Sequence, residues 1–210
     1  MAVKFYYRSI KVSSNSIFAD FEETLVVPAI DYLYWVKSRG APPEVDEIYR
    51  QRRQEVTANR TEKSWINYLS MYTGLMNIGD FGEMANGYSL NPKFVQWAEK
   101  FRQREGYKTV VIDVLTKGFD HVVKLYFGRS DVQNTLSSLG VEIGQIIGAE
   151  CEFQNGVLSK VSRAIYAKRP LVKDGYIMLG DNDEVREFGK YEHFVNLSTW
   201  EPSSNSSQSF

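Results

Sequence analysis

Three short apolar runs are the clearest feature of the hydrophobic pattern, and a polar residue closes each of them. Residues 17–19 lead to Asp20, residues 109–115 to Thr116, and residues 176–179 to Gly180 and Asp181. Runs that are apolar at nearly every position are typical of parallel strands covered on both faces. The pattern therefore predicts three buried strands, with residues 194–197 as a candidate fourth.

Apolar residues recur at helical spacing between the first two runs. This spacing predicts helices at residues 30–36, 45–56 and around 65–72, and residues 27–90 read as helical throughout. Asn91-Pro92 opens another helix, because proline is favoured in the first helical position. Beyond the second strand the pattern predicts helices at 120–127 and 133–139, and a hairpin around Asn155-Gly156.

Strands and helices that alternate in this way indicate an α/β fold with a Rossmann-like parallel sheet. We expect residues 1–26 and 91–200 to form this core, and residues 27–90 to form an inserted, all-helical cap. The last segment, 201–210, is rich in serine and has almost nothing to bury, so we expect a disordered tail.

Composition narrows the possible partners. The 210 residues include 25 basic and 26 acidic side chains, for a net charge of −1, so no global field favours nucleic acid or an anionic membrane. The single cysteine, Cys151, excludes an intramolecular disulfide and a cysteine-rich zinc site. No signal peptide or membrane span is recognisable, and we expect a cytoplasmic protein that acts on a small molecule. The sequence does not determine its oligomeric state.

The polar residues at the three strand ends suggest a chemistry. Ligands of open parallel sheets bind outside the carboxyl ends of the strands, so Asp20, Thr116 and Asp181 are predicted to converge. Two adjacent carboxylates repel unless a cation or a proton lies between them, and oxygen ligands without histidine favour Mg²⁺. This combination points to phosphoryl transfer.

The same residues carry a resemblance to a known superfamily. Residues 17–25, with Asp20 and Thr24, resemble the first motif of haloacid-dehalogenase-like (HAD) hydrolases, a buried strand followed by Asp-x-Asp-Gly-Thr-Leu. Thr116-Lys117-Gly118-Phe119 is similar to the second motif of phosphoserine-phosphatase-like members, and Gly180-Asp181 to the fourth. The order of the motifs and the helical insertion between the first two also agree with that branch.

The resemblance implies a role for each matching residue. Asp20 would be the nucleophile, and Glu22 would take the place of the second aspartate as acid and base. Thr116, with Lys117 and Gly118, would bind the phosphoryl oxygens. Mg²⁺ would be held by Asp20, the backbone carbonyl of Glu22, and Asp181. Lys168 is the first choice for the charge-neutralising lysine, and Lys173 is the alternative.

Three positions depart from the superfamily pattern. Glu22 keeps a carboxyl group but adds a methylene, and a displacement of about 1 Å can cost about 10²-fold in rate. Glu23 replaces a glycine that usually permits a tight turn. Val185 stands where a second acid of the fourth motif is expected, which leaves Asp183 or Glu184 to assist the metal.

Several interpretations of function follow. The leading hypothesis is a Mg²⁺-dependent phosphomonoester phosphatase that forms an aspartyl-phosphate at Asp20. A second is a catalytically impaired phosphate-binding or regulatory protein with the same fold, and a third is the topology without any phosphate site. Arginines of the cap either contact an anionic substrate or form a solvated helix face, the more common case: Arg50, Arg52, Arg53 and Arg60. The cap aromatics, including Trp65, are expected to be interhelical core.

Overall fold

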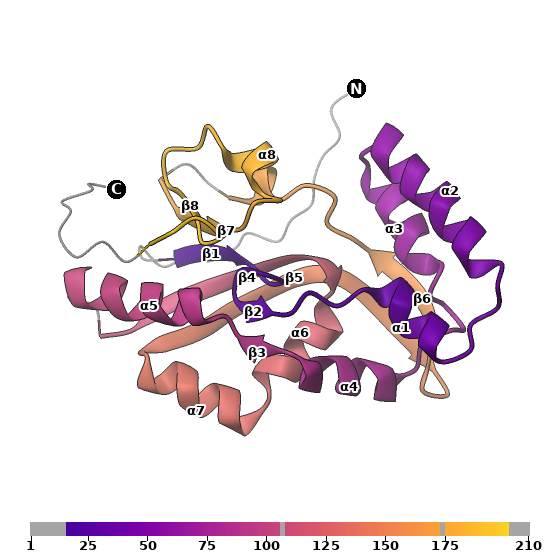
Figure 1. The fold of residues 1–210 in the computed structure, drawn as a ribbon, viewed down its shortest axis with the longest axis horizontal. Helices are drawn as coiled ribbons and strands as arrows, with labels where there is room; N and C mark the ends of the chain where they lie inside the picture. Colours follow the sequence, from indigo (N-terminus) through magenta and orange to yellow (C-terminus); the bar gives the residue numbers. More distant parts are fainter. Residues whose placement is uncertain (1–15, 106–107, 173–174, 202–210) are drawn as a thin grey trace.

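A six-stranded sheet forms the centre of the molecule (Figure 1). The structure, a computed structural model, describes residues 16–105, 108–172 and 175–201. The strand order is β6-β5-β4-β1-β7-β8, and every neighbouring pair is parallel except the β5–β6 hairpin. The strands are β1 (Ser16–Asp20), β4 (Val110–Phe119), β5 (Val141–Gln154), β6 (Val157–Arg163), β7 (Ile177–Gly180) and β8 (Phe194–Asn196). The predicted α/β class is therefore confirmed.

Strand β1 lies between β4 and β7, and the register of these three strands positions the polar residues at their ends. Asp20 is level with Leu115 of β4, and Ala19 is level with Leu179 of β7. Side chains alternate along β1, so Phe18 packs into a smaller apolar cluster on one face of the sheet and Ala19 into the main core on the other. Because the strands are parallel, their carboxyl ends lie at one edge of the sheet.

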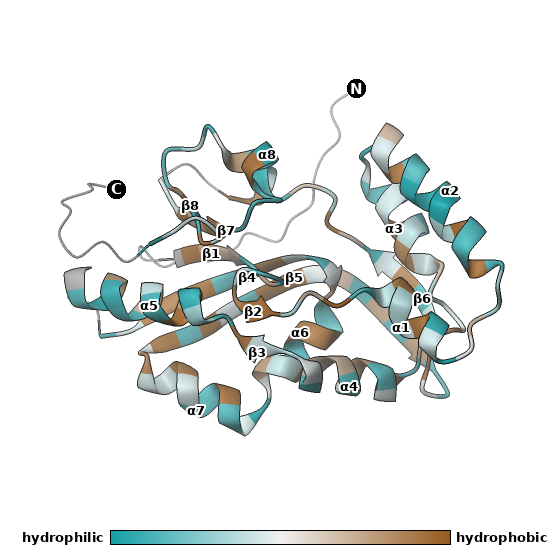
Figure 2. Ribbon diagram, in the orientation of Figure 1, coloured by the Kyte–Doolittle hydropathy of each residue, from teal (hydrophilic) through white to brown (hydrophobic). Residues whose placement is uncertain are grey.

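The two faces of the sheet are covered unequally (Figure 1). Helices α5 (Pro92–Glu105), α6 (Asp120–Phe127) and α7 (Ser130–Ser138) lie on one face. Among the described residues, the 3-10 turn η1 (Arg169–Leu171) and the single-turn helix α8 (Val185–Phe188) pack on the other face, where Leu171 and Phe188 contact the cluster of Phe18. Hydrophobic residues are concentrated on the strands, whereas helix α2 (Val45–Ala58) is mostly hydrophilic (Figure 2).

The segment predicted to be a helical cap contains α1 (Tyr32–Ser38), α2 (Val45–Ala58), α3 (Glu62–Ser70) and α4 (Ile78–Gly87). Helices α2 and α3 pack together, while α4 packs against α6 of the core. The expectation that this segment is entirely helical is wrong at its ends. An antiparallel pair is formed there by Val26–Val27 (β2) and Ser89–Leu90 (β3). The segment that leaves the sheet and the segment that returns to it run side by side, and each provides hydrogen-bond partners for the backbone groups of the other.

Helix α4 was not distinguished by the hydrophobic pattern. It contains three glycines, which weaken intrinsic helix propensity. A capping box between Asn77 and Asp80 and the packing against α6 stabilise it instead. The predicted division into core and cap at residues 26 and 91 stays an interpretation.

The hairpin around Asn155-Gly156 is present, and both residues have positive φ, 52° and 77°, as a tight hairpin turn requires. Strand β4 continues three residues beyond Thr116, further than the apolar run indicates. None of the helices in the described parts of the chain is long and apolar enough to cross a membrane. Most of the tail predicted to be disordered, residues 202–210, lies outside the described residues.

Candidate active site

The polar residues at the strand ends meet at one edge of the sheet, as the sequence predicts. Asp20 is the last residue of β1, Thr116 lies in β4 and Asp181 directly follows β7. All three side chains are buried, with exposed fractions of 8% for Asp20 and 3% for Asp181. The two aspartates therefore adjoin, whereas a chain with this topology and no phosphate site was expected to keep the ends of their strands apart.

Asp20, Asp181 and Glu184 form a compact group of carboxylates. Each has an oxygen within 4.8 Å of the others. Burial, together with the charge of Glu184, raises the pKa of Asp20 to about 8 against the opposing effect of Lys168. Burial and Glu184 likewise raise the pKa of Asp181 to about 7. Burial therefore favours the protonated form of Asp20 and leaves Asp181 close to its titration midpoint at neutral pH, unless another positive charge is present.

The donor set of this group fits a hard divalent cation. The oxygen Oε2 of Glu184 is buried without a hydrogen-bond partner among the described residues, although the carboxyl of Asp181 lies beside it. An unpaired oxygen in such a place indicates a missing cation or proton. A purely oxygen donor set, with no histidine or cysteine, is the kind that Mg²⁺ prefers.

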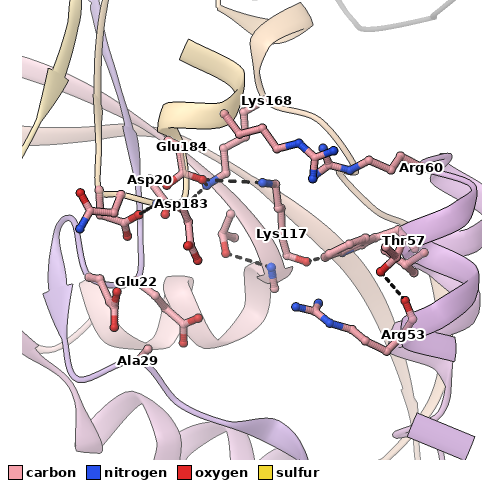
Figure 3. Close-up of a pocket in the computed structure, with 18 residues that line it drawn as sticks. Asp20, Glu22, Ala29, Arg53, Thr57, Arg60, Lys117, Lys168, Asp183 and Glu184 are labelled. Carbon is pink, nitrogen blue, oxygen red and sulfur yellow. Dashed lines mark hydrogen bonds and ion pairs between the residues drawn. The ribbon is translucent and has the colours of Figure 1, made fainter. Parts of the chain in front are cut away.

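Lys168 supplies the positive charge that the group already has. Its ammonium forms ion pairs with Asp20 and, at 2.8 Å, with Glu184 (Figure 3). Its side chain is buried (1% exposed), and although burial alone would lower the pKa of Lys168, the two carboxylates raise it. The alternative, Lys173, lies outside the described residues.

Glu184, rather than Asp183, is the second acid near the strand ends. Burial would raise the pKa of Glu184, but the neighbouring ammonium of Lys168 lowers it to about 2. Asp183 is exposed, and its backbone amide donates to Asp181 Oδ1 at 2.7 Å. Val185 is also exposed and belongs to α8. The acid is therefore displaced by one position from the superfamily pattern, which the sequence left open.

The residues after Asp20 form a tight turn, although Glu22 and Glu23 both depart from the superfamily pattern. Glu23 has φ 59°, in the left-handed region where glycine is favoured. The turn is held by the side chain of Asn91, whose Nδ2 donates to the Glu23 carbonyl at 2.7 Å. Glu22 is half-buried, and burial raises the pKa of its carboxyl against the hydrogen bonds that it accepts from Tyr88 and Ile30.

The segment Thr116-Lys117-Gly118 lies beside these groups. Thr116 Oγ1 accepts a hydrogen bond from the Gly118 amide at 3.0 Å. The ammonium of Lys117 is 3.2 Å from Glu187 and 3.7 Å from Glu184, so it forms ion pairs with two acidic side chains. The Lys117 carbonyl accepts a hydrogen bond from Trp65 Nε1 at 2.8 Å, which joins helix α3 to this strand end.

Comparison with known proteins identifies the fold. Neither a protein-family model nor the sequence of a curated protein matches the chain. Phosphoserine phosphatase from T. onnurineus, in complex with NDSB-201, is similar in structure, with a TM-score of 0.52 and 13% identity over 89% of this chain and 86% of that chain. So is a phosphoserine phosphohydrolase-like protein from Francisella tularensis subsp. tularensis SCHU S4, with a TM-score of 0.52 and 15% identity over 87% and 86%. The chain has a HAD-like fold. At these identities the likeness concerns the fold, and any chemistry must be argued from the residues of the site.

A pocket of about 650 Å³ lies over the strand ends of this HAD-like sheet. Its floor contains Asp20, Thr116, Lys168 and Asp181. Its upper wall comes from α2, the following turn and α3. The residues of the upper wall are Arg53, Val56, Thr57, Arg60 and Trp65. The side chains of Arg53 and Arg60 extend from α2 and the turn after it toward the strand ends (Figure 3).

The pattern of the cap arginines was only partly interpretable from the sequence. Arg50 and Arg52 do not line the pocket and pair with Glu47 and Glu55 at 2.8 and 3.1 Å. Arg53 and Arg60 do line it, together with Thr57. Arg53 and Thr57 are four residues apart in α2 and so share a helix face, which was the available signal, whereas Arg60 follows the end of this helix at Ala58. Trp65, expected to be core, is largely buried and also contributes to the pocket wall.

Proposed function

We propose that the protein is a Mg²⁺-dependent phosphomonoester phosphatase that forms an aspartyl-phosphate at Asp20. The observation that carries the proposal is the buried group of Asp20, Asp181 and Glu184, with the ammonium of Lys168 between two of them, at the floor of an open pocket. The position of this carboxylate in a pocket beside a buried lysine supports a nucleophilic role for Asp20.

The carboxylates of Asp20 and Asp181, together with Glu184, would hold Mg²⁺, and the backbone carbonyl of Glu22 would be a further ligand, as the resemblance implies. The bound cation would neutralise negative charge on the carboxylates and on the transferring phosphoryl group. It would also replace the protons that burial otherwise leaves on Asp20 and Asp181.

Each chemical step can be assigned to side chains of this chain. Asp20 attacks phosphorus in line, and the bond to the leaving alkoxide breaks as Glu22 gives that oxygen a proton. Glu22, now a carboxylate, then removes a proton from water that attacks the phosphorus of the aspartyl-phosphate. The phosphorus–Asp20 bond breaks, inorganic phosphate leaves, and both side chains return to their first state. Thr116 and Lys168 would bind the phosphoryl oxygens throughout.

The upper wall of the pocket supports a small, anionic substrate. The guanidinium group of Arg53 faces the space that the leaving group would occupy, and that of Arg60, 3.8 Å from Glu187, lies beside it, while the phosphate would lie at the strand ends. Arginine in this position suits a carboxylate or a second phosphate.

The test is hydrolysis of 4-nitrophenyl phosphate and a panel of alkyl phosphates with and without Mg²⁺. We expect Mg²⁺-dependent turnover that falls by about 10³-fold or more in Asp20→Asn, because the nucleophile is lost. Asp183→Asn is the matched control, since this exposed carboxyl also lines the pocket and lies outside the carboxylate group; its rate should stay within about threefold of wild type.

Absence of turnover across the panel, or an active Asp20→Asn variant, would overturn the proposal. The impaired phosphate-binding protein is the specific alternative, favoured by the departures at Glu22 and Val185. Beryllofluoride with Mg²⁺ separates the two functions, because tight binding without any hydrolysis supports the alternative and hydrolysis excludes it.

A further inference from the structure

Glu22 is held by two donors at a single oxygen. Its Oε1 accepts a hydrogen bond from the hydroxyl of Tyr88 and another from the amide of Ile30 at 3.1 Å. No hydrogen bond to its second oxygen, Oε2, occurs among the described residues, and the side chain lines the pocket. The restraint therefore acts on the side chain that is one methylene longer than the superfamily pattern.

The hydroxyl of Tyr88 is rigidly placed. Strand β3 begins one residue after Tyr88, and pairing of Ser89 with Val27 of β2 brings this part of the chain next to the turn after Asp20. The ring is fully buried and packs edge-on against Phe21 and Tyr126, with centroids 5.0 and 5.9 Å apart. A buried aromatic ring with fixed neighbours presents its hydroxyl in one direction.

We propose that Tyr88 is a positioning residue for Glu22. Its hydroxyl and the Ile30 amide draw the long side chain back from the reacting centre, and Oε2 is left to exchange protons with the leaving group and the attacking water. This inference rests on the proposed phosphatase function. The restraint would compensate for the extra methylene, which otherwise places the carboxyl about 1 Å from where an aspartate would act.

Leaving groups of different basicity test this role. A poor leaving group, such as an alkoxide, needs a proton from Glu22, whereas 4-nitrophenolate leaves without one. We expect Tyr88→Phe to lower kcat/KM for an alkyl phosphate by about 10 to 100-fold, with the loss mainly in kcat, and to lower it for 4-nitrophenyl phosphate by less than about threefold.

Tyr126→Phe is the matched control. Tyr126 belongs to the same aromatic cluster and is equally buried, but its hydroxyl has no hydrogen-bond partner among the described residues. Removal of this hydroxyl should leave kcat/KM for both substrates within about twofold of the wild-type value, since the hydroxyl restrains no catalytic group.

The Glu22→Asp background tests the positioning directly. The shorter side chain cannot reach the Tyr88 hydroxyl from the same backbone, so Tyr88→Phe should change alkyl phosphate hydrolysis by less than about threefold in this background. Equal losses for the two substrates, or the same loss in both backgrounds, would overturn the inference and leave the phosphatase proposal intact. A wild-type chain without turnover would overturn the phosphatase proposal itself.

Equilibrium unfolding checks the contact independently of activity. In a cycle of Tyr88→Phe and Glu22→Met, which keeps the length of the side chain but removes the acceptor oxygen, the two changes should be coupled by about fivefold in the unfolding equilibrium constant, as for a typical hydrogen bond. Coupling below about twofold would mean that the hydrogen bond does not restrain Glu22, and would overturn the inference.

Discussion

The floor and the upper wall of the pocket differ in burial and in the way their charges are balanced. The floor consists of strand ends whose side chains are buried and mutually charged, with Lys168 between Asp20 and Glu184. The upper wall comes from the hydrophilic helix α2, the turn after it and α3, and its arginines Arg53 and Arg60 are exposed. A change in the floor therefore alters fold and chemistry together, whereas a change in the upper wall should alter substrate preference alone.

The largest effect is expected at the floor. Lys168→Met removes the only ammonium that pairs with Asp20 among the described residues and leaves two buried carboxylates without it. We expect the free energy of unfolding in metal-free buffer to fall by about 3 kcal/mol, measured by urea denaturation. Lys100→Met, at an exposed position of α5, should change it by less than about 0.5 kcal/mol. Similar values for the two variants would contradict the contrast between buried floor and exposed surface.

Mg²⁺ should stabilise the floor without substrate. At 10 mM Mg²⁺ and a dissociation constant of about 1 mM, binding contributes about 1.4 kcal/mol, which corresponds to a Tm increase of about 3 to 6 °C for a chain of this size. Asp181→Asn should abolish the increase, because the variant loses a carboxylate of the group. Scanning calorimetry at matched ionic strength measures the Mg²⁺-dependent change in Tm of the wild type and of the variant. An increase that persists in Asp181→Asn would place the cation elsewhere.

A smaller and more selective effect is expected at the upper wall. Arg53→Ala should raise KM roughly threefold for a phosphate ester whose leaving group carries a carboxylate or a second phosphate, with kcat unchanged, because exposed ion pairs contribute about 0.7 kcal/mol. Arg50→Ala on the same helix is the control, since Arg50 pairs with Glu47 outside the pocket. Steady-state kinetics distinguish the two positions, and equal effects would remove Arg53 from substrate recognition.

The smallest effect is expected at Glu23, in the turn that follows β1. Glu23 has φ 59°, a conformation that costs a non-glycine residue about 1 kcal/mol, partly offset by the greater freedom of glycine in the unfolded chain. Glu23→Gly should therefore raise the free energy of unfolding by about 0.5 kcal/mol in urea denaturation. Glu23→Ala removes the same charge and keeps the strain, so it should show no such gain. A gain in both variants would indicate relief of charge repulsion instead.

The floor was predictable to a much greater extent than the upper wall. Asp20, Thr116 and Asp181 each follow an apolar run, so their position at or near the carboxyl ends of strands could be inferred from local sequence, although β4 continues to Phe119. Glu184 could not be preferred over Asp183, because their order depends on how a single-turn helix begins after β7. The arginines could not be sorted, because a hydrophilic helix has no apolar stripe to fix which face it presents.

The pattern of apolar runs and helical spacing was sufficient to determine the class of fold and the succession of most of its strands and helices along the chain, since both follow from local periodicity. The tertiary structure decided which side chains meet across distant parts of the chain: Lys168 with Asp20, Tyr88 with Glu22, and α4 with α6 rather than with the other helices of the insertion. Local periodicity carries no information on such contacts, because they depend on strand register and on how buried side chains pack.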